Sequence, residues 1–344
     1  MSSPMTQEQR YIKMTETPIS RLIPSLAIPT IISMLVTSIY NMADTFFVSQ
    51  ISTSASAAVG VSYSLMAMIQ ALGFTLGMGS GNYLSRVLGS RDTEKAERIA
   101  STGFYSAIFV ELLFALICLP NLDRVVRLLG ATDTIAPYAK DYARYILIAA
   151  PVMTGALSMN NLLRFQGLAV YSMIGITTGG ILNMILDPIF IFGLDLGISG
   201  AALATILSQA VSAAWVLRFL SSAKSGIRIR RGNMKFEKRV VGKVIGLGIA
   251  PFIMQSTESL VNITLNAGLQ RYGGDLYVGS MTIMQSVMQM LVMPIQGITQ
   301  GAQPIMSYNY GAKNYSRVRK TFSLLLKVML LVTVSGFALA ALLP

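Results

Sequence analysis

The sequence contains no histidine and a single cysteine in 344 residues. Without histidine, the chain lacks the side chain that most often changes charge near neutral pH, in catalysis, metal binding and pH sensing. The one thiol, Cys118, lies within an apolar run and has no second cysteine with which to form an internal disulfide. We therefore predict a buried free thiol and no histidine-dependent chemistry.

Charged residues are also scarce. They make up 12% of the chain, against about 25% in soluble domains, while 53% of the residues are hydrophobic. The sequence has no GxxxxGK(S/T) loop for ATP and no HExxH, CxxC or GxSxG motif. We predict a protein that is not an enzyme, that needs no cofactor, and that belongs to the all-α class as a polytopic membrane helix bundle.

Nine apolar segments are each long enough to cross a bilayer as a helix of about 20 residues. They lie at about 22–46, 57–84, 99–120, 138–160, 168–192, 198–220, 243–268, 276–303 and 321–343.

The net charge of +12 is unevenly distributed. Lysine and arginine gather before the first segment and in the loops after the second, fourth, sixth and eighth segments, most densely at 218–243. Between the third and fourth segments, Asp123, Asp133 and Asp141 balance the basic residues. Because cytoplasmic loops carry an excess of lysine and arginine, the pattern predicts a cytoplasmic N-terminus. We interpret the positive charge as a determinant of orientation and expect no nucleic-acid partner.

The two halves of the chain repeat each other at an offset of 219 to 222 residues. The matched pairs are Pro29 with Pro251, Gly60 with Gly279, Gly77 with Gly297, Gly81 with Gly301, and Gly89 with Gly311. A repeat of this length predicts two six-helix units of the same topology. The GxxxG spacing of the matched glycines predicts close helix packing.

This repeat divides the chain into four parts. We expect a cytoplasmic tail at 1–18, a lobe of six membrane helices at 19–222, a basic linker at 223–240, and the first three helices of a second lobe at 241–344. On this interpretation the second lobe is C-terminally truncated, and three further helices or a partner would complete it.

Three segments carry a resemblance to a known family. They are IPTIISMLVTSIYNMADTFFV, PVMTGALSMNNLLRFQG and NMILDPIFIFGLDLGISGAALATILSQ. Together they resemble the bacterial multidrug and toxic compound extrusion (MATE) transporters, of the DinF-like and NorM-like branches. The resemblance covers residues 19–341 and implies two lobes facing each other in a V. It also implies alternating access driven by Na⁺ or H⁺, a monomer, and export of drug-like molecules across the bacterial plasma (inner) membrane.

The family's polar cluster in the first lobe matches five positions of this sequence. They are Asp44, Tyr142, Asn183, Asp187 and Thr205, with Pro29 as the bend of the first helix.

The residues themselves support such a cluster. Asp44 is the only charged side chain between Leu22 and Ser85, and an acid at mid-membrane costs about 2.5–3.5 kcal/mol on insertion scales. Asn183 and Asp187 are four residues apart and share one helix face. Their oxygen atoms suit a hard cation such as Na⁺, while two desolvated carboxylates could instead carry a proton.

Pro188 predicts a bend in the same helix, because it has no N–H for the carbonyl of Met184. Two alternatives stay open: Asp187 and Pro188 could start a new helix, and Asn183 could make only an interhelical hydrogen bond.

Two further acids lie in apolar segments. Glu258 is a candidate second cation or substrate site, although the repeat matches Asn266 rather than Glu258 to Asp44. Glu111 is expected near a helix end or in a structural pair.

The leading functional hypothesis is an antiporter of amphipathic, cationic compounds. A lipid-linked precursor flippase is the runner-up, for which Lys327 is the one expected basic residue in a membrane segment. The third alternative is an inactive, truncated transporter fragment.

Overall fold

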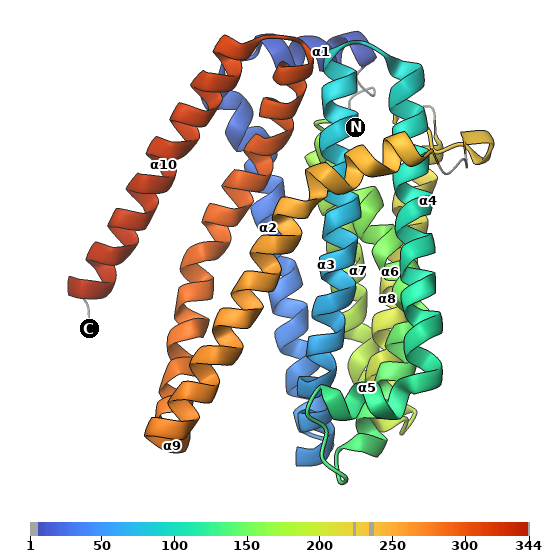
Figure 1. The fold of residues 1–344 in the computed structure, drawn as a ribbon, viewed down its shortest axis with the longest axis vertical. Helices are drawn as coiled ribbons and strands as arrows, with labels where there is room; N and C mark the ends of the chain where they lie inside the picture. The colour runs from blue at the N-terminus through green and yellow to red at the C-terminus, as the bar shows by residue number, and fades with distance from the viewer. Residues whose placement is uncertain (1–5, 223–224, 234–236, 343–344) are drawn as a thin grey trace.

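The computed structural model describes residues 6–222, 225–233 and 237–342, and all the regular structure within these ranges is helical (Figure 1). The first half contains α1 (Gln7–Glu16), α2 (Ile19–Ser49), α3 (Thr53–Gly89), α4 (Thr93–Cys118), α5 (Leu122–Leu128), α6 (Ala136–Phe165), α7 (Ala169–Pro188) and α8 (Gly197–Ser221). The second half contains α9 (Lys238–Gly311) and α10 (Tyr315–Leu342), and the short turns are η1 (Leu119–Asn121), η2 (Ile189–Gly193) and η3 (Arg231–Asn233). The predicted all-α class is confirmed, and Cys118 is a buried free thiol.

Eight segments of the described chain are long and apolar enough to cross a membrane. Six of them lie between Ile19 and Ser221, where six were predicted, and the other two are Lys238–Glu258 and Tyr315–Ala338. The predicted segment at 276–303 is not among them. It lies in the second part of α9, where many side chains are outside the described part of the structure.

The bundle has two different ends. We call the end that carries α1 the N-terminal end and the opposite one the far end. In Figure 1, α9 runs from the N-terminal end to the far end and returns, and α10 then diverges from the other helices. At the far end, Arg127 pairs with Asp123 (3.1 Å) and Asp133 (2.7 Å), and Lys140 pairs with Asp123 (2.9 Å). These ion pairs join two of the basic residues there to Asp123 and Asp133, two of the three aspartates that were expected to balance them.

Helix α6 is the most enclosed of the candidate membrane spans, because 72% of its most apolar stretch is buried inside the protein. It contacts α3, α4, α7 and α8. Close packing on α3 depends on glycine, because a Cβ atom at Gly77 would lie 2.9 Å from Asn161 and one at Gly81 would lie 2.4 Å from Phe165. The close packing predicted from the GxxxG spacing is therefore present at these two positions.

The two halves meet where α3 crosses the last turns of α9. A Cβ atom at Gly89 would lie 2.0 Å from the carbonyl oxygen of Tyr308, and one at Gly311 would lie 1.8 Å from that of Arg86. The contact is reciprocal in the sequence repeat, since residues 86 and 89 correspond to 308 and 311 at an offset of 222. The two repeated helices therefore cross at equivalent positions, with backbone directly against backbone.

Two hydrogen bonds one turn away follow the same reciprocal pattern. Ser85 donates its hydroxyl to the carbonyl of Pro304 (3.1 Å), and Ser307 donates to Oδ1 of Asn82 (3.1 Å). At the same offset, residues 82 and 85 correspond to 304 and 307. Polar contacts thus close the N-terminal end between the halves.

Helix α1 lies across this closed end, within the range where an N-terminal tail was expected. Its start has a complete capping box, because the Thr6 hydroxyl accepts from the Gln9 amide and the Gln9 side chain accepts from the Thr6 amide. Asn309 of α9 donates to the carbonyl of Met14 (2.9 Å), and Arg317 of α10 donates to the carbonyl of Thr17. The helix therefore ties the second half of the chain to the first.

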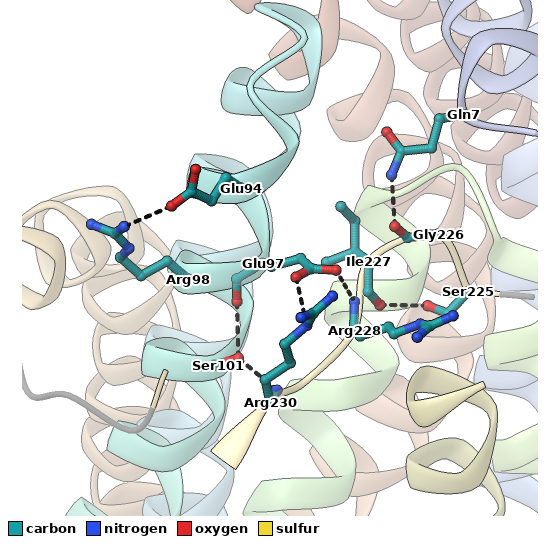
Figure 2. A network of polar contacts seen from close by, with 10 residues as sticks. All are labelled: Gln7, Glu94, Glu97, Arg98, Ser101, Ser225, Gly226, Ile227, Arg228 and Arg230. Atoms are coloured by element: carbon teal, nitrogen blue, oxygen red, sulfur yellow. Dashed lines mark hydrogen bonds and ion pairs between the residues drawn. The ribbon is translucent and has the colours of Figure 1, made fainter. Parts of the chain in front are cut away.

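The linker after α8 docks on α4 and α1 (Figure 2). The carboxylate of Glu97 accepts from the Arg228 amide (3.4 Å) and pairs with the Arg230 guanidinium (2.9 Å). Gln7 of α1 donates to the carbonyl of Gly226 (2.6 Å), and Arg10 donates to that of Ser225. Burial lowers the pKa of the Arg10 guanidinium from its ordinary value.

Close packing between α3 and the first part of α9 leads to a stability prediction. A Cβ atom at Gly248 would lie 1.8 Å from the carbonyl oxygen of Thr75, whereas one at Gly246 would have nothing within 4 Å. We expect Gly248→Ala to destabilise the protein by about 1–3 kcal/mol, because backbone must move to admit the methyl group. Gly246→Ala should be neutral or slightly stabilising. Thermal unfolding of both variants in detergent measures the difference, and equal midpoints would contradict a role for Gly248 in this crossing.

Candidate cation-binding site

Helix α7 lies between α2 and α8 because its glycines admit both neighbours closely. A Cβ atom at Gly180 would lie 3.0 Å from the Tyr40 ring of α2, and one at Gly179 would lie 3.0 Å from Ser212 of α8. A Cβ atom at Gly175 would lie 2.7 Å from the Val216 side chain of α8. This packing aligns the later turns of α2 and α7 with the early turns of α8, where the predicted polar residues lie.

Three of those residues form a buried hydrogen-bonded group. The amide nitrogen of Asn183 donates to Oδ1 of Asp187 (3.1 Å) and to the hydroxyl of Thr205 (3.3 Å). Asp187 is 0% exposed, Asn183 2% and Thr205 6%. The one amide group therefore joins α7 to α8 and orients the buried carboxylate.

Asp44 and Tyr142 lie near this group, and we call the five residues together the pocket. Asp44 of α2 interacts electrostatically with Asp187, and Tyr142 of α6 interacts with both carboxylates. The Tyr142 side chain is only 1% exposed. The structure thus gathers all five predicted residues from α2, α6, α7 and α8.

The pocket contains oxygen atoms with unused acceptor capacity. Oδ1 of Asp44, Oδ2 of Asp187 and Oδ1 of Asn183 are all buried without a hydrogen-bond partner. Buried polar atoms are nearly always paired, so three acceptors in one pocket indicate a missing donor or cation. Carboxylate, amide and hydroxyl oxygens suit Na⁺, and a proton on either acid would also satisfy one acceptor. No cluster of three or more acids, cysteines or histidines is found among the described residues.

The helix around Asp187 is continuous rather than newly started. Helix α7 ends at Pro188 and passes directly into the π-helical turn η2, in which Leu194 donates to the carbonyl of Ile189 (2.9 Å). The alternative in which Asp187 and Pro188 begin a new helix is therefore wrong. Pro29 is buried inside α2 without ending it.

The sequence interpretation did not include two further members of the pocket. Tyr40 lies one helical turn before Asp44, interacts electrostatically with it, and lies next to Gln209 of α8. The four-residue spacing from Asp44 was the available signal for Tyr40. Nothing in the sequence pattern singled out Gln209.

The other acids lie apart from this group. Glu258 is exposed on α9, and the side chain of Asn266 lies outside the described part of the structure. Glu111 of α4 is 0% exposed and accepts a hydrogen bond from Thr154 of α6 (3.1 Å), in agreement with a structural pair. Lys327 is exposed on α10.

Membrane-spanning helices that enclose a carboxylate pair define an integral membrane protein of the polytopic transporter class. The MatE family model matches residues 29–189 and 251–344, which is most of the chain. The protein belongs to the MATE family, whose members are transporters and not enzymes.

Curated relatives are similar over most of this chain. The multidrug export protein MepA of Staphylococcus aureus strain NCTC 8325 is 28% identical over 309 residues, covering 90% of this chain and 68% of MepA. MepA of Staphylococcus haemolyticus is 26% identical over 321 residues, covering 93% of this chain and 71% of that protein.

Solved structures share the arrangement of the helices. A MOP superfamily transporter from Pyrococcus furiosus, described as having a binding pocket of reverse polarity that suggests a different function, matches with a TM-score of 0.90 and 25% identity. The match covers 99% of this chain and 75% of that one. An outward-facing multidrug resistance MATE transporter matches with a TM-score of 0.89 and 25% identity, over 98% of this chain and 74% of the other.

The hydrogen bonds of Asn183 lead to a second stability prediction. Asn183→Leu leaves the buried Asp187 carboxylate without its amide donor and should lower stability by about 1–3 kcal/mol. The double variant Asn183→Leu/Asp187→Leu removes both polar partners, so it should regain much of the stability that Asn183→Leu alone loses. Thermal unfolding in detergent compares the two. A double variant no more stable than Asn183→Leu alone would show that the buried carboxylate is not the source of the cost.

Proposed function

We propose that this protein is a secondary active exporter that exchanges amphipathic, cationic compounds for Na⁺ or H⁺ by alternating access. The observation that carries the proposal is the pocket of Asp44, Asn183 and Asp187, in which three buried acceptor oxygens have no partner. A carboxylate pair within membrane helices is costly, and such residues usually mark ion or proton pathways.

Coupling would follow from electrostatics. With both acids ionised, the desolvated negative charges repel each other, and a bound cation or proton relieves the repulsion. The charge state of the pocket would therefore bias the packing of α2 against α7, since Asp44 lies on α2 and Asp187 on α7. Asn183 would keep Asp187 oriented in either state.

The substrate class is inferred from the relatives and from charge. The similar proteins in two staphylococcal species are named multidrug export proteins. A negatively charged pocket favours cationic drug-like molecules over anions, and we propose that the transporter acts as a monomer. We do not propose the flippase alternative, because the carboxylates of Asp44 and Asp187 would repel an anionic pyrophosphate.

We place the protein in the plasma (inner) membrane of a bacterium, with its N-terminus in the cytoplasm. The N-terminal end carries α1, the Arg91 turn, the linker with Arg228 and Arg230, and the turn at Lys313. A basic cytoplasmic end agrees with the positive-inside rule.

Transport by reconstituted protein tests the coupling proposal. In vesicles with an imposed Na⁺ or proton gradient, the protein should drive gradient-dependent movement of ethidium. Asp44→Asn and Asp187→Asn should reduce that movement to background, because a near-isosteric amide cannot carry a proton or neutralise Na⁺. Protein folding is checked by the thermal unfolding midpoint, which should not fall.

Asp195→Asn is the matched control for this experiment. It makes the same chemical change at an exposed residue just beyond η2, where a positive φ of 54° suits asparagine equally well. The control should retain transport. Full activity in Asp44→Asn, or an equal loss in Asp195→Asn, would refute the assignment of the pocket.

The orientation is tested separately with a tag on the N-terminus. In spheroplasts, a protease added outside should leave the tag intact, and it should remove the tag from inverted membrane vesicles. Cleavage in spheroplasts would place the basic end outside the cell and reverse the proposed topology.

A further inference from the structure

Arg164 follows the fourth predicted segment (138–160) and precedes the fifth (168–192), which predicts a loop position. It lies instead in the last turn of α6, between the two halves of the chain. Its guanidinium donates one hydrogen bond to Oε1 of Gln300 on α9 and another to Oδ1 of Asn161 on α6. Its Nε is buried and has no hydrogen-bond partner. Among the residues that the structure describes, no carboxylate lies within ion-pair distance of Arg164.

Tight helix packing fixes the position of this guanidinium. Gly77 of α3 admits Asn161, and Gly301, next to Gln300, packs so closely on α2 that its Cβ atom would lie 2.6 Å from the Cα atom of Ala27. Arg164 therefore lies where α2, α3, α6 and α9 converge at the N-terminal end. Asp44 lies 17 residues beyond Ala27 on α2, about 25 Å away by helix rise. The arginine is thus outside the cation pocket and on the closed side of it.

We propose that the contact between Arg164 and Gln300 is a latch that holds the N-terminal end closed and must break for that end to open. The inference rests on the alternating-access cycle proposed above. A buried cation held by neutral amide oxygens is bonded less strongly than one paired with a carboxylate. When the halves separate, water can solvate the guanidinium and satisfy its Nε. The latch is therefore strong enough to close the end and weak enough to release it.

The charge of the acceptor at position 300 should set how often the end opens. Gln300→Leu leaves the buried cation without its partner on α9 and should favour opening. Gln300→Glu turns the hydrogen bond into a buried ion pair and should favour closure. The two substitutions are therefore expected to act in opposite directions.

Labelling of a buried cysteine measures the open fraction. In a Cys118→Ser background, the reporter Ser85→Cys replaces a side chain that is 0% exposed and faces Pro304 across the closed end. A water-soluble maleimide reaches it only when the end opens. The labelling rate of purified protein, without drug or gradient, should rise about five- to tenfold with Gln300→Leu and fall by a similar factor with Gln300→Glu.

Two further variants make the test specific. Arg164→Gln added to Gln300→Glu should abolish the slower labelling, because the new carboxylate then has no cation. Gln296→Glu adds the same charge one turn away on α9 and should leave the rate unchanged. Labelling rates that move in the same direction for both Gln300 variants, or a Gln296→Glu effect as large as that of Gln300→Glu, would overturn the latch. Because this readout needs no transport, its failure is distinguishable from failure of the proposed antiport.

Discussion

The close crossing of α3 and α9 is the contact on which the arrangement of the two halves depends. At Gly89 and Gly311 a side chain would collide with the carbonyl of the facing helix, so the two helices can meet only where both lack one. The contact repeats itself at the 222-residue offset, as do the hydrogen bonds from Ser85 and Ser307. Two units of the same topology thus meet through equivalent surfaces, and the N-terminal end is where they are held together.

A second constraint comes from the membrane. A carboxylate within a spanning helix must find partners inside the protein, because lipid offers none. Asp187 accepts a hydrogen bond from the Asn183 amide one helical turn away. Close packing at the glycines of α7 brings α2 with Asp44 and α8 with Thr205 next to this pair. The result is a pocket in which the acids are enclosed but not fully hydrogen-bonded. On the proposed function, that combination would keep the site responsive to a cation or proton.

These two regions are separated along the bundle, which gives each a distinct role. Asp44 and Asp187 lie nearer the far end, whereas Arg164 and its amide partners Asn161 and Gln300 lie at the closed end. Helix α1 and the docked linker lie outside them at that end (Figures 1 and 2). Arg164 belongs to the closed end because of packing alone. Its neighbours in sequence predicted a loop residue, and only the contact with Gln300 on α9 reveals a buried cation between the halves.

The sequence by itself determined the class and the main elements. Scarce charge and long apolar runs predicted membrane helices, since each must bury its own backbone polar groups. Asp44 stood out because it is the only charge in its segment, and the four-residue spacing of Asn183 and Asp187 indicated a shared face. Tertiary structure alone decided the rest. It places Tyr40 and Gln209 beside the pocket and leaves Glu258 exposed on α9. It also ties the two halves of the chain together through α1 and turns Arg164 toward α9. The periodicity of apolar residues in the sequence describes one helix at a time. The contacts between helices depend instead on where glycines allow two backbones to approach closely.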